Sequence, residues 1–152
     1  MKKKIKLPEL QVKITRKNKE YEKFNIGNPE DVFNFAKLVF DSDTILWKEE
    51  FILLCINTAS DVIGTIRISS GGVAGTVVDP KWVFTSALGC CASGIILIHN
   101  HPSGNLKASA QDIAVTEKIV TVGRALDINV LDHIIIGGDF DGYISMNELN
   151  LM

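Results

Sequence analysis

The 152 residues of this chain, 46% hydrophobic and 22% charged, suit one compact globular domain with a hydrophobic core of its own. No apolar run approaches the about 20 residues of a membrane span, and no apolar stretch follows the first lysines, which argues against a transmembrane helix and a secretory signal. A net charge of −2 and three cysteines without a CxxC pair argue against a broadly basic surface and a disulfide framework, and they predict a cytoplasmic protein with reduced thiols.

The chain begins with a basic arm, residues 1–24, which we expect to be distinct from the domain of residues 25–152. The arm holds nine Lys or Arg and three Glu, a net charge of +6, whereas the remainder holds seven basic and fifteen acidic residues, a net charge of −8. Polar and apolar side chains alternate over residues 9–15, which indicates an edge strand. The arm could contact nucleic acid or another anionic partner, although a solvated terminus explains the same charge and is favoured.

Helix and strand patterns follow one another in the domain without strict alternation. Asn28-Pro29 and Asp79-Pro80 each supply an N-cap and a first-turn proline, so helices are expected to begin there, the second running from about Lys81 to about Cys91. Ser109 is expected to cap a third helix, to about Leu126. Apolar runs predict strands at 50–57, 62–68, 95–98, 129–136 and 143–146. The mixture predicts an α/β fold with a mixed β-sheet flanked by helices.

Two histidines follow the buried strand predicted at 95–98. His99 and His101 are two residues apart, so their side chains point to the same side. The pair alone is equally well explained by buried histidines that bond to the backbone. Ser109 and Asp112 stand at a helix start, where they also resemble a capping box. Because the intervening loop is short, it can return Asp112 to the histidines and leave a fourth tetrahedral position for water, as in catalytic zinc sites.

A zinc hydrolase also needs a side chain that carries protons, and a carboxylate beside the metal serves that purpose. Glu49 and Glu50 lie at the start of the strand predicted at 50–57. Side chains alternate along a strand, so the two glutamates face opposite sides and only one can serve. Taken without further information, two exposed glutamates flanking a strand remain the favoured interpretation.

The spacing of these residues resembles a known signature. His99-x-His101, seven residues and then Ser109-x-x-Asp112 is similar to the motif of the JAB/MPN metalloprotease domain, also called JAMM. The likeness covers about residues 28 to 147 and is closest to the bacterial RadC-like branch. The segments that carry it are HNHPSGN at 99–105, GGVAGTVVDP at 71–80 and LDHIII at 131–136.

The resemblance implies a cytidine-deaminase-like JAB/MPN fold and a role for each residue of the motif. Ser109 would donate a hydrogen bond to the oxyanion of a tetrahedral intermediate. Glu49 would be the catalytic glutamate, with Glu50 as the alternative. His133, next to Asp132 in a predicted strand, is expected to support the site and not to bind the metal. The implied Zn²⁺ ligands are His99, His101 and Asp112.

The implied function is a zinc-dependent hydrolase that cleaves a peptide, amide or isopeptide bond with a metal-activated water. The alternative is a RadC-like accessory protein of DNA repair or recombination, acting on or near nucleic acid. Members of the branch usually carry a helix-hairpin-helix-type segment, which this sequence lacks, and this absence argues against the DNA-repair role. A non-catalytic scaffold ranks last because every ligand of the motif is present. Trp47 and Trp82 are expected in the core or an interface, while the substrate and oligomeric state stay open.

Overall fold

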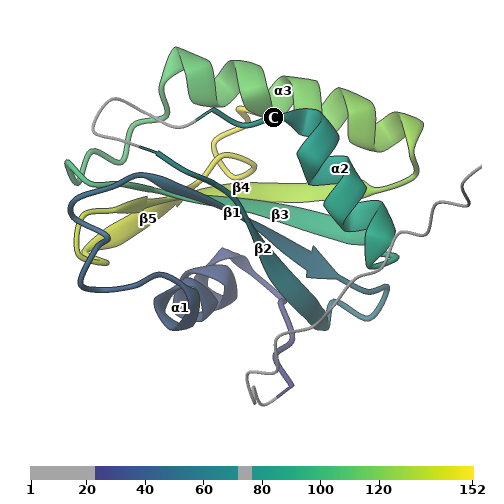
Figure 1. Cartoon of the computed structure of the whole chain (residues 1–152), viewed down its shortest axis with the longest axis horizontal. Helices are drawn as coiled ribbons and strands as arrows, with labels where there is room; N and C mark the ends of the chain where they lie inside the picture. Colours follow the sequence, from purple (N-terminus) through teal and green to yellow (C-terminus); the bar gives the residue numbers. More distant parts are fainter. Residues whose placement is uncertain (1–22, 72–76) are drawn as a thin grey trace, which may run out of the picture.

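The computed structural model describes residues 23–71 and 77–152. The predicted edge strand at 9–15 and nearly all of the basic arm lie outside these residues, as does most of the glycine-rich connection at 71–75. In the described part, a five-stranded sheet lies between one helix on its lower face and two helices on its upper face (Figure 1). The predicted mixed sheet flanked by helices is therefore confirmed.

Each helix begins at the cap that the sequence predicts. Helix α1 (Pro29–Val39) is capped by Asn28, α2 (Pro80–Gly89) by Asp79 and α3 (Ala110–Ala125) by Ser109. Each capping side chain accepts a hydrogen bond from a backbone N–H of the first turn, which a helix leaves unsatisfied. No helix in the described part of the chain is long and apolar enough to cross a membrane.

The five strands pair in the order β2-β1-β3-β4-β5. Strand β1 is antiparallel to both β2 and β3, β3 is parallel to β4, and β4 is antiparallel to β5. Strand β3 runs on past the predicted end at Ile98, because its pairing with β4 continues to His101 opposite Gly137. The strands are β1 (Glu50–Ile56), β2 (Val62–Ser70), β3 (Gly94–His101), β4 (Asn129–Gly137) and β5 (Gly142–Ser145).

Alternate residues of β1 and β3 enter two different hydrophobic cores. Ile52 and Ile98 pack with α1 in the core below the sheet. Phe51 and Leu97 pack with α2 and α3 in the core above it. Because side chains alternate along a strand, the odd-numbered residues of β1 and β3 face α2 and α3.

Helix α3 is the crossover that joins the parallel strands β3 and β4. The crossover puts the start of α3 beside the end of β3, with only residues 102–108 between them. Gly123 lets the helix approach the sheet closely, because a Cβ there would lie 2.7 Å from the Ile128 carbonyl oxygen and 2.9 Å from Val130 Cγ2. The connection therefore fixes which residues of α3 lie near the end of β3.

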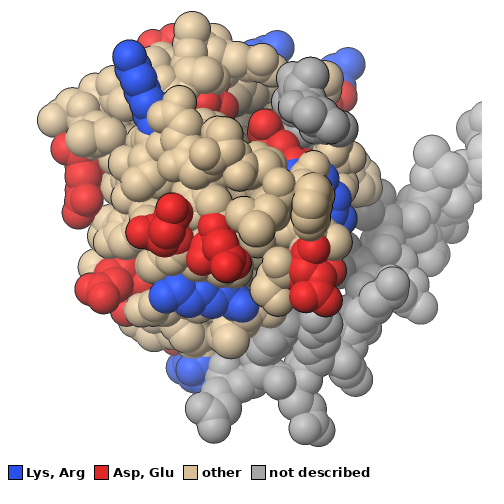
Figure 2. Space-filling view, turned by 90° about the vertical axis from the view of Figure 1, so that its left-hand side faces the viewer, with Lys and Arg blue, Asp and Glu red and all other residues tan. Residues whose placement is uncertain are grey.

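The left-hand side of the molecule in Figure 1 is seen face-on in Figure 2. In the described part of this face, basic and acidic side chains are scattered among uncharged ones, and no continuous basic area covers it. A surface that binds nucleic acid through its charge normally gathers Lys and Arg in a patch or stripe. The described part of this face has no such pattern.

Candidate metal centre

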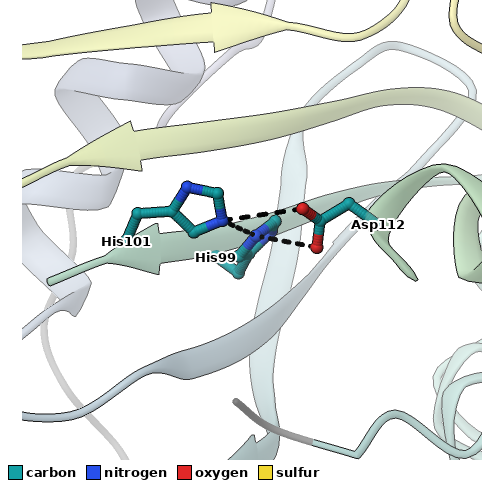
Figure 3. Close-up of side chains that lie close together, drawn as sticks. All are labelled: His99, His101 and Asp112. Carbon is teal, nitrogen blue, oxygen red and sulfur yellow. Dashed lines mark hydrogen bonds and ion pairs between the residues drawn. The ribbon is translucent and has the colours of Figure 1, made fainter. Parts of the chain in front are cut away.

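His99, His101 and Asp112 bring three potential ligand atoms together (Figure 3). The two histidines project from β3 and the aspartate from the first turn of α3. His99 Nε2 lies 2.9 Å from His101 Nε2 and 3.2 Å from Asp112 Oδ1, and His101 Nε2 lies 3.6 Å from Asp112 Oδ2. The β3–α3 crossover thus assembles the three residues that the sequence predicts as ligands.

The separations of these atoms fit a single tetrahedral cation. Ligand bonds of about 2.0–2.1 Å to zinc place two ligand atoms about 3.3 Å apart. The observed separations of 2.9, 3.2 and 3.6 Å lie on both sides of that value. Two imidazoles and one carboxylate leave the fourth position open, which is the arrangement of catalytic rather than structural zinc sites. The cluster could therefore hold a metal ion with room for one water.

A hydrogen bond to the carbonyl oxygen of Asn105 sets the tautomer of His101. His101 Nδ1 lies 2.5 Å from this oxygen. A carbonyl oxygen only accepts, so Nδ1 carries the hydrogen. In a neutral ring the lone pair is then on Nε2, the atom that faces the cluster. The loop after β3 thus prepares His101 as a ligand.

His99 is prepared by a longer chain of hydrogen bonds. Its Nδ1 lies 2.8 Å from His133 Nε2, and His133 Nδ1 lies 2.6 Å from Thr116 Oγ1. The Thr116 hydroxyl donates to the carbonyl oxygen of Asp112 at 2.5 Å, so it must accept from His133 Nδ1–H. Burial of His133 lowers its pKa well below the usual range and keeps the ring neutral.

All hydrogen bonds in this chain donate in the same direction, from His99 through His133 and Thr116 to the backbone of Asp112. Neutral His133 has its lone pair on Nε2 and accepts from His99 Nδ1–H, which leaves the lone pair of His99 on Nε2, toward the cluster. The bonds return through Thr116 to the backbone of Asp112 and so connect two of the three ligands. His133 lies outside the ligand cluster, as predicted, and the structure assigns it the support of His99.

The charges of the cluster are those of a cation site. The hydrogen bond with Asp112 raises the pKa of His101. Burial alone would raise the pKa of Asp112, but hydrogen bonds with His101 and His99 outweigh it and hold that pKa well below its usual range. Asp112 is therefore an ionised carboxylate, and the positive charge that balances it is either a proton on imidazole or a metal ion.

Ser109 caps α3 with its oxygen atom. Ser109 Oγ accepts from the Asp112 N–H at 3.1 Å, and Asp112 Oδ2 accepts from the Ser109 N–H at 2.7 Å. The predicted capping box is thus present together with the predicted ligand geometry. Since the cap uses the Ser109 hydroxyl only as an acceptor, its O–H can still donate into the cavity that Ser109 lines.

The two glutamates at the start of β1, Glu49 just before it and Glu50 as its first residue, face opposite sides of the sheet. Glu49 lines the same cavity as His101 and Asp112, and its charge helps to raise the pKa of His101. Glu50 is buried, with Lys48 Nζ 2.8 Å and Arg67 Nε 3.3 Å from its Oε1. The alternation expected from a strand therefore puts Glu49, and not Glu50, beside the cluster.

The cavity beside the cluster has a volume of about 990 Å³. Its lining includes Trp47, which is 75% exposed and therefore not in the core, so of the predicted core or interface position only the interface stays a prediction. Trp82 is also 50% exposed. Lys107 and Lys118 line the cavity as well, the latter on the face of α3 that continues from Asp112.

The fold and the cluster together define a mixed α/β domain with a His-His-Asp cluster that could hold a metal ion. The chain belongs to the RadC-like JAB domain family, whose family model matches residues 26–151. The predicted resemblance to the RadC-like branch and to the JAB/MPN fold is confirmed. The prediction of a separate arm at residues 1–24 stays a prediction.

Curated relatives support the same family. The chain is 40% identical over 129 residues to a UPF0758 protein of Alkaliphilus metalliredigens, across 85% of this chain and 53% of the relative. It is 42% identical over 130 residues to a UPF0758 protein of Methanosarcina barkeri, across 85% of this chain and 54% of the relative. The chain thus spans about half the length of the curated relatives it matches.

Thr116 and Asn100 contribute to the site, although no role is predicted for either of them from the sequence. Thr116 and Asn100 are both fully buried polar residues inside a helix and a strand. A polar residue at an apolar position is a signal, because its hydrogen-bonding groups must be satisfied within the protein. Their hydrogen-bond partners lie far away in the chain. The sequence therefore shows that each residue needs a partner, but it does not show which partner it has.

Proposed function

We propose that this domain is a zinc-dependent hydrolase of the JAMM type that cleaves a peptide, amide or isopeptide bond. The observation that carries the proposal is the open cluster of His99, His101 and Asp112 with Glu49 lining the same cavity. Zinc is the proposed ion because its tetrahedral coordination by imidazole and carboxylate matches the ligand types and spacing. Cys55, Cys90 and Cys91 are free thiols, which suits a reducing compartment such as the cytoplasm.

A zinc ion in the cluster would polarise the substrate carbonyl and lower the pKa of a water molecule toward about 7. Glu49 takes the proton from the attacking water as the new C–O bond forms. Ser109 donates its hydroxyl hydrogen to the oxygen that becomes negative at the carbonyl carbon. Glu49 then gives the proton to the leaving nitrogen as the C–N bond breaks, so that acid and amine products form.

The cavity favours a polypeptide as substrate. Its volume of about 990 Å³ lies at the upper end of the roughly 300–1,000 Å³ of small-molecule pockets. Trp47 and Leu46 are exposed apolar residues of its lining and offer apolar contacts. Lys107 and Lys118 also line the cavity and can pair with a carboxylate of the bound chain. These features suit an extended segment that presents both apolar and acidic side chains.

The first experiment measures zinc and turnover in the same preparations. Protein purified without added zinc should hold about one zinc per chain, and His101→Ala should lose it. Incubation with peptide and isopeptide libraries, followed by mass spectrometry, should reveal cleavage. Glu49→Gln should keep the zinc and lose turnover by about 10²–10⁴-fold, because the proton carrier is gone.

The control is Glu117→Gln, which changes an exposed glutamate of α3 in the same way. This variant should keep both zinc and turnover. Well under one zinc per chain, unchanged in His101→Ala, would sink the proposal. So would full turnover in Glu49→Gln, since the named proton carrier would then be dispensable.

A further inference from the structure

Asn100 stands between the two histidine ligands but faces the other side of the sheet. His99 and His101 point toward α3, and alternation along β3 turns the side chain of Asn100 to the opposite face. The residue is completely buried, with 0% of its surface exposed. A buried amide must find partners for its donors and its acceptor.

All three partners of the Asn100 side chain belong to one segment of backbone. Its Nδ2 donates to the carbonyl oxygens of Ile45 at 2.7 Å and Lys48 at 2.9 Å. Its Oδ1 accepts from the Glu50 N–H at 2.8 Å. The two carbonyl acceptors and the one N–H donor of the backbone fix the orientation of the Asn100 amide. In a flipped amide, Oδ1 would face the two carbonyl oxygens and Nδ2 would face the N–H group.

These hydrogen bonds hold the backbone on both sides of Glu49. The carbonyl of Lys48 and the N–H of Glu50 belong to the two peptide groups that flank Glu49. The main-chain ladder between β1 and β3 ends at Phe51 and His99, so the Asn100 side chain takes over where strand pairing stops. On the other edge, the Gly71 N–H donates to the carbonyl oxygen of Glu49 at 2.9 Å.

We propose that Asn100 is a positioning residue that holds Glu49 in place relative to the metal ligands. The last three residues of β3 thus present two ligands on one face and the support of the proton carrier on the other. The role of Glu49 in this inference rests on the proposed function, whereas the support of its backbone does not. An error of about 1 Å in the position of a catalytic group can cost about 10²-fold in rate.

The test uses the full chain loaded with Co²⁺, a paramagnetic ion of similar coordination, and with Zn²⁺. Wild-type protein should show slow exchange of the Glu50 amide hydrogen and well-defined pseudocontact shifts at the amides of residues 48–50. In Asn100→Ala, exchange of the Glu50 amide should speed up at least about tenfold, and the shifts should shrink as this segment moves. Zinc stoichiometry should stay at one, because neither histidine is changed.

If the wild-type protein cleaves a peptide, its kinetic constants distinguish the positioning of Glu49 from the binding of substrate. In Asn100→Ala we expect kcat to fall about 10²-fold with KM little changed. The matched control is Asn57→Ala, at the far end of β1, where the Asn57 side chain accepts from the N–H groups of Ala59 and Asp61. It should lose comparable side chain–backbone bonds and leave residues 48–50 and kcat as they are.

The outcomes distinguish this inference from the proposed function. Unchanged exchange and pseudocontact shifts in folded Asn100→Ala would overturn the positioning role, even with an active hydrolase. Fast exchange of the Glu50 amide in wild-type protein would overturn it as well, and this measurement stands even if the variant does not fold. The expected exchange and shifts in protein that cleaves no peptide would support the positioning role and overturn the hydrolase.

Discussion

At the scale of single residues, each ligand of the cluster is oriented by a bond made away from the metal position. His101 donates from Nδ1 to the Asn105 carbonyl, and His99 donates from Nδ1 to His133. In their neutral form, both rings therefore present the lone pair of Nε2 to the cluster. Such partners fix the tautomer and raise the basicity of a ligand, so the site is organised before an ion arrives.

The raised pKa of His101 predicts how metal affinity depends on pH. The hydrogen bond with Asp112 lifts this pKa above its ordinary 6.5. Protonated imidazole cannot bind a metal, so zinc must displace one proton from His101 below the raised pKa. Affinity should be constant above that pKa and fall by about tenfold for each pH unit below it.

Titration calorimetry with Zn²⁺ between pH 5.5 and about 8.5 measures this dependence. Runs in two buffers of different ionisation enthalpy count the protons released, which should approach one per zinc at low pH. An affinity that is flat over the whole range, with no proton released, would contradict the assignment of His101 as a ligand that competes with a proton.

At the scale of elements, two helices share one capping device, but only one of them carries the site. The capping box of α1 consists of Asn28 and Asp31, and that of α3 consists of Ser109 and Asp112. The same pair of bonds therefore stabilises both helix starts. In α3 the device also fixes the two side chains beside the metal position, so stability and function overlap in these residues.

This overlap predicts different results for Ser109→Ala and Asn28→Ala. Each variant should lose about 1 kcal/mol of unfolding free energy, because each loses an N-cap hydrogen bond. Only Ser109→Ala should also lose turnover, by about 10²–10³-fold, since its hydroxyl would donate to the oxyanion. Urea denaturation and peptide cleavage measure the two effects, and an equal loss of kcat in both variants would show that Ser109 acts through stability alone.

Local chemistry explains which elements the sequence predicts well. Asn28, Asp79 and Ser109 predict helix starts correctly, because an N-cap residue bonds to the first turn of the helix that directly follows it in the sequence. The end of β3 is predicted too early, since its extension to His101 depends on pairing with β4. The family resemblance names Glu49 first and keeps Glu50 as the alternative, and the structure favours Glu49 because the odd-numbered residues of β1 and β3 share a face.

At the scale of the whole molecule, the ligand motif and the supporting role of His133 are predictable, whereas the contacts that provide the support are not. His99, His101 and Asp112 lie within one β3–α3 connection, so their spacing in sequence carries over into space. Thr116, His133 and Asn100 act through contacts between elements that only the complete fold brings together. The nucleic-acid contact assigned to the arm stays a prediction, because residues 1–22 lie outside the described structure.

Binding of zinc to the folded chain alone must stabilise the whole domain. At a free zinc concentration of 100 times Kd, the gain is about 2.7 kcal/mol. For a domain of this size, 1 kcal/mol corresponds to about 2–4 °C in Tm, so zinc should raise Tm by about 5–10 °C and chelation should reverse the rise.

A matched pair of variants decides whether the predicted cluster causes this shift. Asp31 and Asp112 have the same place in their capping boxes, and Asp31 belongs to α1, away from the ligands. Asp31→Asn and Asp112→Asn should both lower Tm without zinc, because each weakens a helix start. Zinc should still raise the Tm of Asp31→Asn, whereas Asp112→Asn, which lacks the anionic ligand, should show little or no rise by calorimetry. An equal rise in both variants would mean that the stabilising ion binds elsewhere.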